Sequence, residues 1–83
     1  MTPAIFTDLA HMRKQECDRP KCLATELAKI GAIVVASFDY STLYVWPFAA
    51  TEQQVVAWHA DNNAGDRLQF HIGQTALTVE MKE

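Results

Sequence analysis

Two cysteines and three histidines are the sulfur and nitrogen ligands that this sequence could offer a metal ion. Cys17 and Cys22 are separated by four residues, and His11 precedes them. A structural zinc site takes four ligands, and no spacing brings His59 or His71 toward the two cysteines. We therefore expect neither a metal nor another cofactor, and we expect both cysteines to be reduced thiols of an intracellular protein.

His59 is the candidate for acid–base chemistry, because it falls on the apolar side of a helical segment, one turn after two valines. A buried imidazole beside a carboxylate can act as a general base. However, no Ser or Cys is tied to His59 by a recognisable pattern, and Asp61 projects from another side of the helix. We expect His59 to be a hydrogen-bonded interior or boundary residue, and His11 and His71 to lie at the surface. The chain is expected not to be an enzyme.

Positive charge gathers in the first quarter of the chain, where it could meet a phosphate backbone. The residues are Arg13, Lys14, Arg19 and Lys21. Glu16 and Asp18 stand among them, no glycine-rich phosphate loop or base-reading helix follows, and the net charge of −3 has the wrong sign for a general nucleic-acid binder. We expect a solvated face here, and keep a small nucleic-acid-binding regulator as the alternative function.

The segment FDYSTLYVWPF, residues 38–48, holds five aromatic rings in eleven positions. Strand alternation places Tyr44, Trp46 and Phe48 on one face and the two aliphatic residues between them on the other. Both faces are apolar, so either the segment is sandwiched in the core or one face is left for a partner. We expect a protein-contact surface, with a target or a second copy of the chain. Its residues are Tyr40, Tyr44, Trp46 and Phe48.

Two helices are expected before residue 31. Thr2 is a suitable N-cap ahead of a proline, and the apolar period that follows continues to about Glu16. Asp18 can cap a second helix that runs to Ile30, where Gly31 ends it in a left-handed conformation. Its inward residues are expected to be Leu23, Leu27 and Ile30.

A β-branched segment, 32–38, and its return, 42–48, predict a hairpin whose second strand ends near Pro47. Thr51 and Gln54 then fit a capping box that opens a third helix, which reaches about Asn62.

A second hairpin is expected in the last segment of the chain, where apolar and polar residues alternate. A two-residue turn at Gly73 and Gln74 pairs position 72 with 75, 70 with 77 and 68 with 79, so the apolar side chains share one side. The same register sets Arg67 across from Glu80, and a one-residue slip would destroy both agreements.

These patterns predict one α+β domain, residues 1–83, with the order ααββαββ and a four-stranded antiparallel sheet that carries its helices on one face. No apolar run approaches the ~18 residues of a membrane span, and residues 1–14 lack the basic start and long apolar core that are typical of a secretory signal. We expect a soluble, cytoplasmic protein. The lack of a catalytic constellation favours a small non-catalytic protein-binding module, an inhibitor, immunity or anti-defence type accessory protein of the kind that phages and mobile elements encode.

Overall fold

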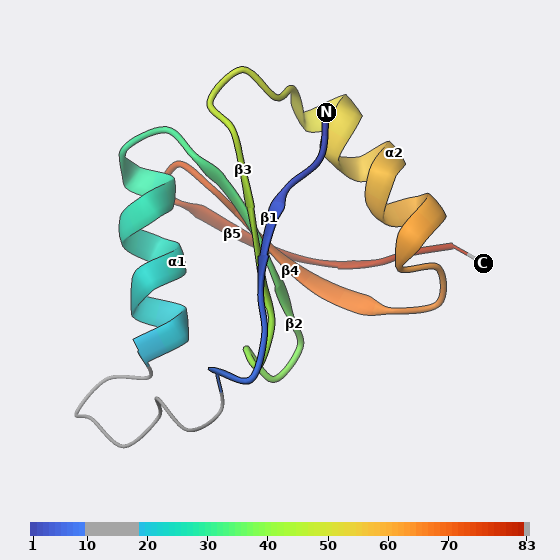
Figure 1. Ribbon diagram of the computed structural model, residues 1–83, viewed down its shortest axis with the longest axis horizontal. Coiled ribbons are helices and arrows are strands. Elements are labelled where there is room, and N and C mark those ends of the chain that lie inside the picture. The colour runs from blue at the N-terminus through green and yellow to red at the C-terminus, as the bar shows by residue number, and fades with distance from the viewer. Residues whose placement is uncertain (10–18, 83) are drawn as a thin grey trace.

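The structure is a computed structural model that describes residues 1–9 and 19–82. Seven helices and strands follow one another in these residues, in the order βαββαββ (Figure 1). They are β1 (Ala4–Phe6), α1 (Arg19–Lys29), β2 (Ile33–Ser37), β3 (Leu43–Trp46), α2 (Glu52–Asn62), β4 (Arg67–Ile72) and β5 (Thr75–Glu80). The expected α+β class and antiparallel sheet are confirmed, but the sheet formed by the described residues has five strands, not four.

The fifth strand is β1, which lies where a helix was expected to begin. Ile5 and Phe6 favour strands, and β3 offers them an unpaired edge, with Ile5 opposite Tyr44 and Phe6 opposite Leu43. This pairing overrides the weak preference for a helix after Thr2. The rest of the predicted first helix, residues 10–16, lies outside the described residues.

The strand order is β1-β3-β2-β4-β5, and every neighbouring pair is antiparallel. The predicted β4–β5 hairpin is confirmed in register, with Phe70 opposite Leu77 and Arg67 opposite Glu80. Arg67 Nε lies 3.8 Å from a carboxylate oxygen of Glu80. The local alternation of the sequence was therefore sufficient to fix this edge of the sheet.

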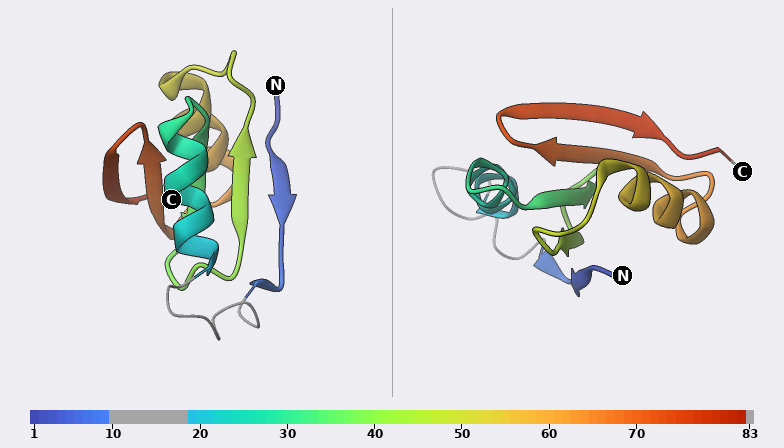
Figure 2. Two further views of the ribbon diagram at one scale, coloured as in Figure 1. Left: turned by 90° about the vertical axis from the view of Figure 1, so that its left-hand side faces the viewer. Right: turned by 90° about the horizontal axis from the view of Figure 1, so that it is seen from above.

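The two helices pack on opposite faces of the sheet, which corrects the expectation of one shared face (Figure 2). Alternate residues of β2 divide between two apolar cores. The α2-side core contains Ile33, Val35, Trp46, Val55, Leu68, Phe70 and Met81. The α1-side core contains Ala24, Ala32, Val34, Ala36, Tyr40 and Leu43.

The handedness of the chain explains this arrangement. β1 and β2 run parallel with β3 between them, and β3 and β4 run parallel with β2 between them. The connection from β1 to β2, through α1, and the connection from β3 to β4, through α2, both move across the sheet in the same direction. However, β1 and β2 run in the direction opposite to that of β3 and β4. Right-handed connections therefore place α1 and α2 on opposite sides.

Small residues set how α1 lies on the sheet. Ala24 and Ala28 are buried, whereas Leu23 and Ile30, which were expected to face inward, are exposed. Leu27 is partly buried against the α1-side core. The helix ends at Lys29, one residue before the predicted Ile30, and Gly31 follows in the predicted left-handed conformation, with a φ of +107° that favours glycine. The consequence is an apolar side chain, Ile30, at the surface beside the helix end.

The predicted capping box of α2 is present. Thr51 Oγ1 accepts a hydrogen bond from the Gln54 amide at 3.2 Å, and Gln54 Oε1 accepts one from the Thr51 amide at 3.0 Å. Two amide groups at the helix start are satisfied in this way.

We expect Thr51→Ala to lower the free energy of unfolding by about 1 kcal/mol, because the Gln54 amide loses its acceptor. Thr51→Ser keeps a hydroxyl and should stay within a few tenths of a kcal/mol of the parent. Urea denaturation of the three proteins measures both values, and equal losses for Ala and Ser would contradict the capping role.

Candidate functional site

The aromatic residues of segment 38–48 lie in different environments. Trp46 is only 2% exposed in the α2-side core, because α2 follows β3 and covers that face. Tyr44, on the same face, is partly buried, and Tyr40 is buried in the α1-side core. Phe48 follows the end of β3 and is 71% exposed. The prediction of an exposed contact surface is therefore wrong for Trp46 and Tyr40, and remains a prediction for Tyr44 and Phe48.

Four aromatic rings surround the fully buried ring of His59. They belong to Tyr44, Trp46, Trp58 and Phe70, with ring centroids 4.9–5.8 Å from that of His59. The contacts are edge-to-face, the geometry that aromatic pairs prefer. His59 is thus a packing residue that joins α2 to β3 and β4.

Two hydrogen bonds fix His59 as a neutral ring. Trp46 Nε1 donates to His59 Nε2 at 3.2 Å, and an indole N–H can only donate. Nε2 therefore carries no proton, so Nδ1 carries it and donates to Asn63 Oδ1 at 2.7 Å. Burial lowers the pKa of His59 from its ordinary value of 6.5, and the hydrogen bond with Asn63 opposes this in part.

Asn63 completes the network at the end of α2. Its Nδ2 donates to the Tyr44 hydroxyl and to Asp66 Oδ2, both at 3.2 Å. Both nitrogens of His59 are committed to structural hydrogen bonds, which confirms the expected interior role. Neither nitrogen is left to accept a proton from a substrate.

His71 was expected at the surface, but it is only 4% exposed. Its side chain does point away from the α2-side core as the alternation of β4 predicts, but α1 covers that face as well. The Tyr40 hydroxyl lies 2.8 Å from His71 Nε2 and donates to Gln69 Oε1 at 3.1 Å. Burial lowers the pKa of His71, and the positive charge of Lys21 lowers it further.

The turn between β2 and β3 brings Tyr40 to this position. Asp39 Oδ1 accepts hydrogen bonds from the Ser41 amide, the Ser41 hydroxyl and the Ser37 hydroxyl, at 2.7–3.0 Å. These bonds stabilise the carboxylate and lower the pKa of Asp39 to about 2. Tyr40 itself has a φ of +61°, a left-handed conformation that is uncommon for a residue other than glycine.

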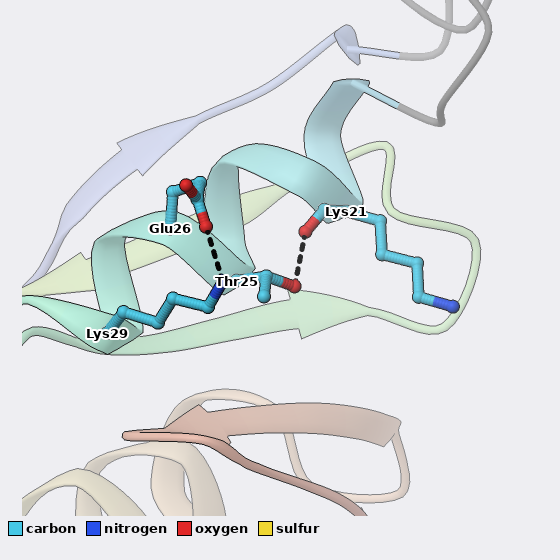
Figure 3. A network of polar contacts seen from close by, with 4 residues as sticks. All are labelled: Lys21, Thr25, Glu26 and Lys29. Atoms are coloured by element: carbon cyan, nitrogen blue, oxygen red, sulfur yellow. Dashed lines mark hydrogen bonds and ion pairs between the residues drawn. The ribbon is translucent and has the colours of Figure 1, made fainter.

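The basic surface considered as the alternative site stays a prediction, because half of its residues lie outside the part of the chain that the structure describes. Arg13 and Lys14 lie outside that part, Arg19 begins α1, and Lys21 is exposed. Figure 3 shows the Lys21 side chain pointing away from the neighbouring Glu26–Lys29 ion pair, whose charged atoms are 3.0 Å apart.

Cys22 is partly buried on α1 and is disulfide-bonded, so the expectation of a reduced thiol is wrong at this position. The second cysteine that was expected to be a reduced thiol, Cys17, lies outside the described residues. Because structural disulfides are rare in reducing compartments, the bond at Cys22 does not favour the expected cytoplasmic location.

An apolar groove of about 470 Å³ lies between β1, the end of α1 and the end of β3. Its walls include Ala4, Leu27, Ile30, Val45 and Phe48. Ile30 is 68% exposed, and the Phe48 ring lies beside Gly31, 3.8 Å from where a Cβ atom would stand. The sequence indicated Phe48 as a contact residue but did not indicate Ile30 or β1. Ala24 and Ala28, one turn apart, were a signal that the side of α1 with these small residues faces the sheet, and not the side with Leu23 and Ile30.

A second, smaller groove of about 110 Å³ lies on the opposite face, between α2 and the β4–β5 hairpin. Its exposed apolar side chains are Val56 and Leu77.

Comparisons of the chain with protein-family models, curated proteins and solved structures found no match. Among residues 1–9 and 19–82, no three or more His, Cys, Asp or Glu side chains are grouped so that they could hold a metal ion. None of the helices described is long and apolar enough to cross a membrane.

We expect Trp46→Ala to lower the free energy of unfolding by ~3–5 kcal/mol, because it leaves a cavity in the α2-side core. Phe48→Ala, in contrast, should change it by no more than about 0.5 kcal/mol. Chemical denaturation at one fixed, low protein concentration is the measurement, since self-association would add apparent stability. A Trp46→Ala protein as stable as Phe48→Ala would contradict the interior position of the indole.

Acidification from pH 7 to pH 5 should destabilise the fold. The pKa values of folded His59 and His71 are lowered, whereas in the unfolded chain both rings take up protons near pH 6.5. Stability is therefore complete above pH 6.5 and falls below it, by at most about 1.4 kcal/mol per pH unit for each histidine.

Urea denaturation across this range measures the slope. His71→Gln removes one titrating ring and should reduce the slope without abolishing it, because His59 remains. A free energy of unfolding that stays constant or rises on acidification would show that the rings are not held neutral.

Proposed function

We propose that the chain is a small non-catalytic protein-binding module whose contact surface is the groove between β1, α1 and β3. The observation that carries this proposal is the exposure of Phe48 and Ile30 side by side at the groove. Aromatic side chains dominate the energetics of many interfaces, and a monomer seldom leaves adjoining large apolar side chains in water.

The electrostatics around the groove fit an apolar partner segment. The charged residues of the last turns of α1, Glu26 and Lys29, are paired with each other. The wall residues carry no charge, so a partner need bring none. A groove of this kind suits apolar side chains of another protein better than phosphate groups.

Catalysis gains no support from the described residues. Both ring nitrogens of His59 are taken up by hydrogen bonds, and His71 is buried beside the Tyr40 hydroxyl, where burial lowers its pKa. The groove itself is lined by groups without acid–base chemistry. We therefore favour an inhibitor, immunity or anti-defence type of accessory protein that acts by contact, over a small nucleic-acid-binding regulator.

Affinity capture from host lysate, with mass spectrometry of the bound fraction, tests this function. The variant Ile30→Ser/Phe48→Ser should bind a captured protein at least about 30-fold more weakly, the equivalent of ~2 kcal/mol at an interface hot spot. The matched control Val56→Ser/Leu77→Ser removes two exposed apolar side chains from the opposite face and should bind as the parent does.

Equal capture by the groove variant and the control would exclude the groove as the contact surface. Recovery of nuclease-sensitive nucleic acid without a stoichiometric protein would favour the nucleic-acid-binding alternative.

A further inference from the structure

The sheet ends on one side in a short strand that carries no charged side chain. Figure 2 shows β1 at one edge and β5 at the other. All three residues of β1 are exposed and apolar, and residues 1–7 contain no charged side chain. Edge strands usually carry charges that prevent pairing with another chain, as β5 does at Glu80. The outer edge of β1 therefore presents no charge that would oppose a further strand.

The side chains of β1 extend this edge onto both faces of the sheet. Ile5, 52% exposed, stands opposite Tyr44 on the α2 side. Ala4 and Phe6 stand on the α1 side, where Ala4 lines the groove and Phe6 is 50% exposed. Because β1 has only three residues, backbone pairing alone would be weak, so these side chains must supply most of a contact.

We infer that the occupant of this edge is β1 of a second copy of the chain, paired antiparallel about a two-fold axis at Ile5. The inference rests on the proposed function, since it takes the groove as a protein-contact surface and names its partner. Centring on Ile5 gives the largest number of pairs that a three-residue strand can make with itself. The two sheets join into one.

The register of the two β1 strands favours a second copy as the partner. Ile5 faces Ile5 of the second copy, and Phe6 of the second copy stands beside Ala4. Residues opposite each other share a face, so that Phe6 ring lies on the groove side, next to an apolar wall. By symmetry the groove of the second copy receives Phe6 of the first.

Charge is also compatible with self-pairing. Each copy carries a net charge of −3, so the repulsion between two copies is smallest where acidic side chains are absent. The first acidic residue after β1 is Asp8, and the two-fold register places it opposite Thr2 of the second copy, not opposite another carboxylate. If the side chains of this edge all carried charge of one sign, a strand of a different protein with the opposite charge would be the favoured partner.

The apolar area is of the order that a dimer needs. An aromatic side chain buries about 150–250 Å², so the exposed parts of Phe6 and Phe48 offer roughly 200–300 Å² per copy. A standard interface buries about 800 Å² per partner, a little over half of it apolar. The two rings are equivalent to about half of that apolar area, and Ile5 at the two-fold axis adds to it.

Sedimentation equilibrium on the parent and on charge variants of Ile5 tests the inference. Ile5→Lys and Ile5→Glu each set like charges opposite each other across the two-fold axis, and should raise the dimer dissociation constant about tenfold or more. An equimolar mixture of the two variants should restore association, because Lys then faces Glu. Leu77→Lys places the same charge on the other edge strand, at a site 51% exposed, and should leave association unchanged.

A second pair of variants tests the register of the two strands directly. It also gives an independent result if a variant of Ile5 fails to fold. Phe6→Lys mixed with Ala4→Glu should associate more tightly than either alone, since positions 6 and 4 face each other. Circular dichroism checks the fold of each variant.

A parent that stays monomeric, or mixtures that associate no better than their components, would overturn the inference. A monomer that still captures a protein through Phe48 would refute the dimer and leave the proposed function intact. A dimer unaffected by the β1 variants would place the contact elsewhere and refute the β1 interface.

Discussion

The burial of β2 on both faces is the constraint on which the rest of the structure depends. Ile33, Val34, Val35 and Ala36 are all buried, and they alternate between two cores that share no side chain. Each core is thin and needs its own helix, so neither α1 nor α2 can be lost without exposing β2. A domain of this size buries only a little over 60% of its unfolded surface, which leaves a small margin for such a loss.

Each core also contains one buried histidine that bonds to a side chain of another element. His59 joins α2 to Trp46 of β3, and His71 joins β4 to Tyr40 of the β2–β3 turn. An imidazole in such a position stabilises the fold only while it is uncharged, because burying the cation would cost several kcal/mol. The groove, in contrast, contains no polar network, and the packing of α1 through Ala24 and Ala28 leaves it uncovered.

Local signals predicted the local features of this chain. The capping box at Thr51, the left-handed Gly31 that follows α1 and the register of the β4–β5 hairpin each depend on residues a few positions apart, and all three are confirmed. The features that the sequence did not predict depend on distant segments. Residues 4–6 became a strand because β3 has an open edge, and His71 and Trp46 became interior because each face of the sheet received a helix. Of the walls of the candidate groove, the sequence predicted only residues at the end of β3, because the others come from β1 and from α1 and its end.

The left-handed conformation of Tyr40 bears on the order in which the chain can fold. The ring of Tyr40 is held by His71 and Gln69, and Gln69 Nε2 donates to the Phe38 carbonyl at 2.9 Å, so the partners of the turn lie about 30 residues further along the chain. Closing a loop of that length costs entropy before any contact is gained. A left-handed tyrosine is itself unfavourable until those partners arrive. Asp39 holds the β2–β3 turn through local hydrogen bonds, but the ring of Tyr40 gains its partners only when β4 pairs with β2, so the last contacts of this hairpin depend on a segment distant in the sequence.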